Sequence, residues 1–210
     1  MSQFLSSEKR WQKNESLRSR VMIFMHEYDA LGHMTLVDIA EENQDSPAFY
    51  LPYHAVENSD STTTKLRVVF NGSARTPSGI ALNEAQCVGP QVQCDVFTLS
   101  LQFRIHPIVI KADIEKMYRQ IEVAPHQRRF QRIIFRENPE DKLKVYELNT
   151  VTYGTAAASY EATRCLQELG IMNRDKFPEA AEAIIDYTYV DDVITGARSV
   201  RKAKKQLKIS

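Results

Sequence analysis

The chain has 210 residues, of which 43% are hydrophobic and 26% charged, and its 27 basic and 27 acidic side chains cancel. This composition is typical of globular domains and excludes collagen, long coiled coils and low-complexity chains. No apolar run approaches the roughly 18 residues of a membrane-spanning helix, and no apolar segment follows the N-terminus as in a secretory signal, so we expect an intracellular, cytoplasmic protein without a membrane partner.

The two signs of charge are separated along the sequence. Residues 65–136 carry 11 basic and 5 acidic side chains, a net charge of +6, whereas residues 137–192 carry 5 and 12, a net charge of −7. Residues 193–210 add 6 basic side chains and no acidic one. A cationic surface beside a carboxylate-rich one could hold a polyanion next to a metal site, although ordinary solvated faces would produce the same pattern.

The N-terminal third predicts a helix followed by a β-hairpin. Apolar side chains at helical spacing over residues 8–31, with Gly32 after them, indicate one long helix. Residues 41–47 are acidic and end in proline, which indicates a connector. Residues 49–56 and 65–70 are rich in β-branched and aromatic side chains and indicate two strands around a polar turn.

The rest of the chain predicts short strands alternating with helices. In chain order we expect a helix over residues 91–104, a buried strand from residue 108 to Asp113, a strand pair over 130–136 and 143–148, a helix from 158 that ends at Gly170, a helix over 178–185, two β-rich arms over 187–195, and a basic helix over 199–209.

The strongest candidate for chemistry is the run Tyr189-Val190-Asp191-Asp192. Two adjacent carboxylates at a tight turn between apolar arms place like charges where burial opposes both. Two unit charges 4 Å apart repel by about 4 kcal/mol at an effective dielectric constant near 20. Bringing Asp113 to the same place would therefore require a divalent cation or a raised pKa. Mg²⁺ accepts such oxygen ligands, whereas the alternative interpretation is a solvated turn.

Three motifs stand in the order of the polymerase motifs of reverse transcriptases: Ile110-Lys-Ala-Asp-Ile-Glu-Lys-Met-Tyr118, Thr152-Tyr-Gly-Thr155 and Tyr189-Val-Asp-Asp192. Residues 50–54, 65–70, 116–120, 130–132 and 146–155 match one group more specifically. Over roughly residues 15–200 the chain resembles the reverse transcriptases of Bel-Pao type LTR retrotransposons.

The resemblance implies an α+β fold, the fingers-and-palm fragment of a polymerase, with an antiparallel palm sheet and helices packed on one face. It implies an N-terminal helical lead-in and connector over residues 1–47 and a reverse transcriptase domain over residues 48–210. The sequence ends before the primer grip and thumb of that family. The protein would then be part of a retrotransposon Pol polyprotein, in the cytoplasm or in element particles, with an oligomeric state that the sequence does not specify.

The resemblance also implies an RNA-directed DNA polymerase that acts on an RNA or DNA template with its primer and on deoxynucleoside triphosphates. Asp113 and Asp191 would bind two Mg²⁺ ions, or Mn²⁺, and Asp192 would support them. The bound metals would activate the primer 3′-hydroxyl and stabilise the leaving pyrophosphate, so no side chain need act as a nucleophile.

Five residues match the nucleotide-binding positions of that family. Lys65 and Arg67 would meet the triphosphate, and Tyr118 would exclude a ribose 2′-hydroxyl. Tyr153 and Gly154 would pack under the incoming nucleotide, with Gly154 allowing close backbone approach. The alternatives are exposed strand charges for the two cations and an ordinary core aromatic for Tyr118.

The expected contacts to the template are Arg128, Arg129, Arg132 and Tyr189. The three arginines would hold phosphates without reading bases. The alternative for the three arginines is a solvated strand edge.

Two positions depart from the family pattern, since Asn71 stands where an aspartate is usual and Ser159 where a proline is common. Two other functions stay open. One is a non-catalytic, truncated remnant that binds nucleic acid weakly. The other is a nucleotidyl cyclase, which would leave Tyr118 and the Tyr153-Gly154 loop unexplained.

Overall fold

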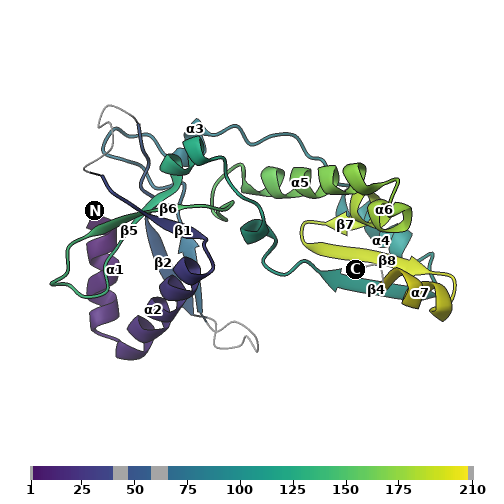
Figure 1. Cartoon of the computed structure of the whole chain (residues 1–210), viewed down its shortest axis with the longest axis horizontal. Helices are drawn as coiled ribbons and strands as arrows, with labels where there is room; N and C mark the ends of the chain where they lie inside the picture. Colours follow the sequence, from purple (N-terminus) through teal and green to yellow (C-terminus); the bar gives the residue numbers. More distant parts are fainter. Residues whose placement is uncertain (1, 40–46, 58–65, 208–210) are drawn as a thin grey trace. The chain divides into compact units, whose positions relative to one another are not determined.

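The protein has an α+β fold with small antiparallel sheets. The computed structural model describes residues 2–39, 47–57 and 66–207, and of these it describes residues 205–207 by their backbone alone. The chain forms two compact units that alternate along the sequence (Figure 1). Unit 1 comprises Met1–Cys87 and Tyr118–Ala158, and unit 2 comprises Val88–Met117 and Ser159–Ser210. None of the described helices is long and apolar enough to cross a membrane.

Two helices begin unit 1, α1 (Ser2–Gln12) and α2 (Glu15–Ala30), where the apolar spacing predicted a single helix. The break has a local cause. The side-chain oxygen of Asn14 accepts a hydrogen bond from the Leu17 N–H at 3.0 Å, which satisfies one of the free donors at the start of a new helix. The prediction of one uninterrupted helix is therefore wrong at Asn14.

The sheets of unit 1 are a hairpin and a three-stranded sheet. The predicted hairpin is confirmed as β2 (Tyr53–Glu57) and β3 (Leu66–Phe70), with Tyr53 opposite Phe70. The predicted strand pair is confirmed as β5 (Arg132–Phe135) and β6 (Lys144–Leu148). The strand β1 (Met34–Val37), which the sequence did not predict, adds to β6 in the order β1-β6-β5.

The N-terminal helices belong to the core of unit 1. Phe4 and Trp11 of α1 pack on Tyr53 of β2, and Val21 and Met25 of α2 are buried in the same cluster. The expected boundary at residue 47 therefore does not divide the structure, because these helices bury their apolar sides against strands that follow that boundary. The expected connector at 41–47 lies, apart from Pro47, outside the described residues.

Short helical turns connect these elements. They are α3 (Leu82–Ala85) and the 3₁₀ turns η1 (Met117–Gln120) and η2 (Pro125–Gln131).

Unit 2 is built on an antiparallel sheet in the order β4-β8-β7. Its strands are β4 (Ile108–Asp113), β7 (Thr188–Tyr189) and β8 (Asp192–Ala197). Its helices are α4 (Val96–Phe103), α5 (Ala158–Asn173), α6 (Pro178–Asp186) and α7 (Val200–Leu207).

Two helix ends in unit 2 differ from the prediction. The helix expected from residue 91 begins at Val96, because the Asp95 carboxylate accepts hydrogen bonds from the N–H groups of Phe97 and Thr98 at 2.9 Å. The helix expected to end at Gly170 continues to Asn173. A Cβ at Gly170 would lie 2.8 Å from Ile185 Cγ1, so this glycine marks the close approach of α6 rather than a helix end.

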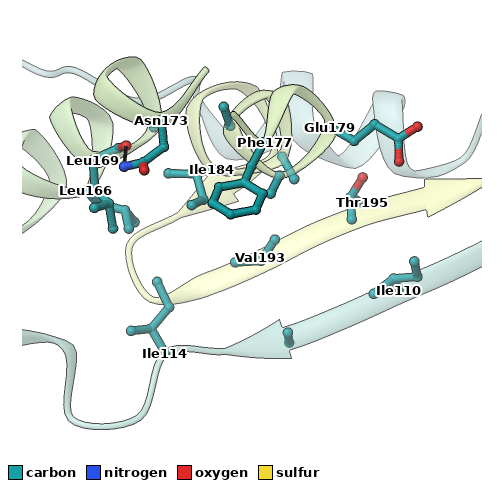
Figure 2. Close-up of a pocket in the computed structure, with 15 residues that line it drawn as sticks. Ile110, Ile114, Leu166, Leu169, Asn173, Phe177, Glu179, Ile184, Val193 and Thr195 are labelled. Atoms are coloured by element: carbon teal, nitrogen blue, oxygen red, sulfur yellow. Dashed lines mark hydrogen bonds between the residues drawn. The ribbon is translucent and has the colours of Figure 1, made fainter. Parts of the chain in front are cut away.

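The two faces of the unit 2 sheet differ. Ile110 and Thr195 line a pocket of about 530 Å³ beneath α5 and α6, into which Leu169 and Phe177 also project (Figure 2). Ala203 of α7 packs in a cluster with Ile110. The neighbouring positions on the strands point to the opposite face, which is open to solvent along β4.

Candidate active site

The register of the unit 2 sheet brings two of the three predicted aspartates together. Asp113, the last residue of β4, is directly opposite Asp192, the first residue of β8. Residues directly opposite each other on antiparallel strands point to the same face, with Cβ atoms about 4.5–5.5 Å apart. Both side chains therefore lie at one end of the sheet on its open face.

Asp191 lies in the tight turn that joins β7 to β8. Tyr189 is opposite Asp192, which leaves Val190 and Asp191 as the two turn residues. Val190 has a φ of 56°, a left-handed conformation that a β-branched residue rarely adopts. The backbone carbonyl of Asp191 accepts a hydrogen bond from the N–H of Ile114 at 2.9 Å, which ties the turn to the residue after Asp113.

A side chain that the sequence did not single out holds the other side of this turn. The N–H of Val190 donates a hydrogen bond to Gln93 Oε1 at 2.8 Å. Gln93 belongs to the segment that was predicted as the first turn of a helix, where its side chain had no assigned partner. Nothing in the local pattern could have identified it, since the two residues are far apart in the sequence.

Lys111 supplies a cation beside the aspartates. Its Nζ lies 3.2 Å from Asp192 Oδ1, and the Lys111 side chain is 65% exposed. Lys111 and Asp192 are diagonal neighbours on one face of the sheet, a spacing that a long side chain can bridge. This ion pair partly offsets the negative charge that the three carboxylates concentrate at the sheet end.

The chemistry of these donors suits a hard divalent cation, because carboxylate oxygens are the ligands that Mg²⁺ prefers. Within the described part of the chain, no three acidic, histidine or cysteine side chains are gathered closely enough to form a ready metal site. Asp113 and Asp192 face each other, and Asp191 adjoins them through its backbone. The residues that would hold a metal are thus neighbours but not a closed cluster.

Of the predicted nucleotide-binding residues that the structure describes, all lie in unit 1. Arg67 is exposed on β3, and Tyr118 is half-buried in η1, whereas Lys65 lies outside the described residues. The Tyr153 hydroxyl donates a hydrogen bond to the carbonyl of Val68. Burial raises the pKa of Tyr153 above its ordinary value, which keeps this hydroxyl a donor.

Gly154 makes a close approach to the protein's own backbone. It has a φ of 96°, and a Cβ there would lie 2.2 Å from the carbonyl oxygen of Phe70. Asn83, which the sequence did not single out, donates to the Gly154 carbonyl at 3.2 Å and accepts from the Ala156 N–H at 2.8 Å. The loop around Gly154 is therefore fastened to the end of β3 and to α3.

The three arginines expected to contact a template are engaged within unit 1 to different degrees. Arg132 has a side chain that is 3% exposed and bonds Glu147 through Nε at 3.0 Å and Nη2 at 2.8 Å. The Arg132 guanidinium is buried and paired with Glu147, so we assign it a structural role and leave it out of the template contacts. Arg128 donates to the Val123 carbonyl at 2.8 Å, and Arg129 is half-buried.

The predicted residues therefore form two groups. The three aspartates and Tyr189, which is 40% exposed, are neighbours in unit 2, and the described nucleotide-binding residues are in unit 1. The sequence matches no model of a known protein family and no curated protein.

Proposed function

We propose that the chain is the fingers-and-palm portion of an RNA-directed DNA polymerase of the Bel-Pao type that its motifs resemble. One observation carries the proposal. The register of β4 and β8 sets Asp113 opposite Asp192, at the turn that contains Asp191. Three carboxylates from two motifs are thereby neighbours at the end of one sheet.

The alternation of the two units along the chain also supports this proposal. Unit 2 would be the palm, since it contains the sheet with Asp113 and the Asp191-Asp192 turn, and unit 1 would be the fingers. Asp113 and Asp192 lie on the open face of the sheet, where a primer and template could reach them. Helices α5, α6 and α7 occupy the other face.

In this proposal Asp113 and Asp191 would hold two Mg²⁺ ions and Asp192 would support them. When bound, the ions would supply positive charge that lowers the pKa of the primer 3′-hydroxyl and offsets charge on the leaving pyrophosphate. The residues of unit 1 bind and orient the nucleotide. Lys65 and Arg67 bind phosphate oxygens, and the Tyr118 ring excludes a ribose 2′-hydroxyl.

Primer extension with Mg²⁺ tests the proposal. We expect Asp113→Asn and Asp191→Asn each to reduce incorporation by at least about 100-fold, as the loss of a group that stabilises a transition state does. Asp175→Asn is the matched control, because Asp175 is an exposed aspartate of the same unit outside the sheet. Equal incorporation by all three variants and the wild-type chain would reject the catalytic assignment.

The second candidate is a non-catalytic remnant that binds nucleic acid weakly. The ion pair between Lys111 and Asp192 favours it, because a protein cation already engages one of the three carboxylates. Binding of a primer-template that weakens with salt, without nucleotide incorporation, would identify this candidate.

A further inference from the structure

The aspartate turn contains a backbone conformation that needs external support. Val190 is β-branched, and its φ of 56° lies in a region where such residues are outliers. Conformations of this kind persist only where surrounding contacts impose them, and they concentrate at functional sites. The contacts that hold Val190 are therefore candidates for residues that position the adjacent aspartates.

Two hydrogen bonds hold the turn from opposite sides. The Ile114 N–H binds the Asp191 carbonyl at 2.9 Å, and Gln93 Oε1 accepts from the Val190 N–H at 2.8 Å. The N–H of the first residue in a two-residue hairpin turn has no partner in the strand ladder, so it requires an acceptor from elsewhere. Gln93 supplies this acceptor from a segment that precedes α4.

The segment around Gln93 is itself fastened. The side chain of Gln91 donates to the Gln93 carbonyl at 3.2 Å, and Gln93 is half-buried. Asp95 follows at the start of α4, where it caps the helix. The acceptor oxygen, Gln93 Oε1, therefore belongs to a segment of unit 2 that hydrogen bonds hold in place.

We propose that Gln93 is a positioning residue for the catalytic aspartates. Its side-chain carbonyl holds Val190 in the left-handed conformation and so keeps Asp191 beside Asp113. This inference rests on the proposed function, because it assigns Gln93 a role in the same metal site. Gln93 acts through the turn and contacts neither the metal nor the substrate.

The experiment measures Mn²⁺ binding to the full chain by electron paramagnetic resonance and the Mg²⁺ dependence of primer extension. Gln93→Leu removes the acceptor with little change in size, and we expect it to weaken Mn²⁺ binding about tenfold, as the loss of an outer partner of metal ligands does. The Mg²⁺ concentration for half-maximal extension should rise by a similar factor. Gln93→Glu retains an acceptor, and its added negative charge favours a cation, so it should bind Mn²⁺ at least as tightly as the wild type.

A second substitution separates positioning from general stability. Glycine adopts positive φ freely, so Val190→Gly in the Gln93→Leu background should restore most of the lost Mn²⁺ affinity. A merely structural role for Gln93 in its own segment would give no such rescue. Gln91→Leu is the matched control, since the Gln91 side chain bonds the same segment but not the turn.

The outcomes distinguish this inference from the proposed function. Unchanged Mn²⁺ affinity in Gln93→Leu, or no rescue by Val190→Gly, overturns the role of Gln93 even if Asp191→Asn abolishes binding. Mn²⁺ binding that Asp191→Asn leaves unchanged overturns the metal site itself. If Gln93→Leu loses its cooperative thermal transition, Gln93→Asn, which shortens the side chain by one methylene, carries the same expectations.

Discussion

The ammonium group of Lys111 lies 3.2 Å from Asp192 Oδ1, on the face of the sheet that also carries Asp113. A cation at this distance competes with a metal ion for the same carboxylate. Its attraction is limited, because the Lys111 side chain is largely exposed and solvent screens the pair. Lys111 is therefore expected to modulate metal binding rather than to prevent it.

Lys111→Met tests this competition. We expect the Mg²⁺ concentration for half-maximal primer extension to fall about two- to fivefold, which corresponds to the energy of an exposed ion pair. Lys202→Met, which removes an exposed cation of α7, is the control and should leave this concentration unchanged. A higher Mg²⁺ requirement in Lys111→Met would show that Lys111 assists the site instead.

Gly154 offers a second test at the residue scale. An alanine there would combine a positive φ with a Cβ placed 2.2 Å from the Phe70 carbonyl oxygen. We expect Gly154→Ala to lower the free energy of unfolding by about 3 kcal/mol or more, since backbone strain and a steric clash add. Gly79→Ala is the matched control, because Gly79 has a φ of 83° with no atom within 4 Å of the added Cβ.

The control separates the two causes. Gly79→Ala should lower the free energy of unfolding by about 1–2 kcal/mol, the approximate strain of a left-handed residue alone. Urea unfolding measures both variants. An equal loss in the two would show that the approach to Phe70 contributes nothing.

At the scale of elements, helix α4 begins where a side chain satisfies its first donors. Hydrogen bonds lower the pKa of the Asp95 carboxyl below its ordinary value of 3.8. The backbone N–H of Thr98 contributes most to this shift, and the Thr98 hydroxyl contributes next. A carboxyl whose pKa is lower in the folded state stabilises that state above its unfolded pKa. The stabilisation is lost as the pH falls through the folded pKa.

Asp95→Asn tests this linkage, because asparagine caps a helix as well as aspartate does but does not titrate. The difference in urea midpoint between the wild-type chain and Asp95→Asn should stay constant above pH 5 or so. Below about pH 3.8 the midpoint of the wild-type chain should fall relative to that of Asp95→Asn. A difference that stays constant down to about pH 2 would contradict the lowered pKa.

The elements also show where local patterns were sufficient. β-Branched and aromatic residues on both sides of a polar turn predicted the β2–β3 hairpin. Pro178 predicted the start of α6, because proline suits the first turn of a helix. Asn14 and Gly170 were misjudged for a different reason. An asparagine can cap a helix and a glycine can allow close contact with a neighbouring helix. Both depend on hydrogen-bond and packing partners that the periodicity of apolar residues does not reveal.

At the scale of the whole molecule, the chain passes between its two units several times, so each core joins segments that are distant in sequence. In unit 1 the ring of Trp11 stacks on Tyr53 at 6.0 Å, and Phe4 meets Trp11 edge to face at 6.2 Å. Helix α1 is thereby part of a core that extends to β6. Loss of its apolar side chains should destabilise unit 1 as a whole.

Phe4→Ala tests this integration, with the fluorescence of Trp11, the single tryptophan of the sequence, as a probe of unit 1. Phe4 is 6% exposed, and truncating a buried phenylalanine lowers the free energy of unfolding by about 3–5 kcal/mol. Ile23→Ala is the control, because Ile23 on α2 is 62% exposed and should change stability by less than about 0.5 kcal/mol. Similar urea midpoints for Phe4→Ala and the wild-type chain would indicate that α1 is a separate lead-in that does not contribute to the stability of unit 1.

The sequence by itself determined the features that depend on residues a few positions apart. These include the paired aspartates between β-rich arms, the hairpin and most helices, since side-chain periodicity and turn chemistry are local. The tertiary structure alone decided the register that sets Asp113 opposite Asp192, the contact of Gln93 with Val190, and the burial of Arg132 against Glu147. Such contacts join segments far apart in the chain, and they are selected by packing and hydrogen-bond satisfaction across the whole unit, which no short stretch of sequence contains.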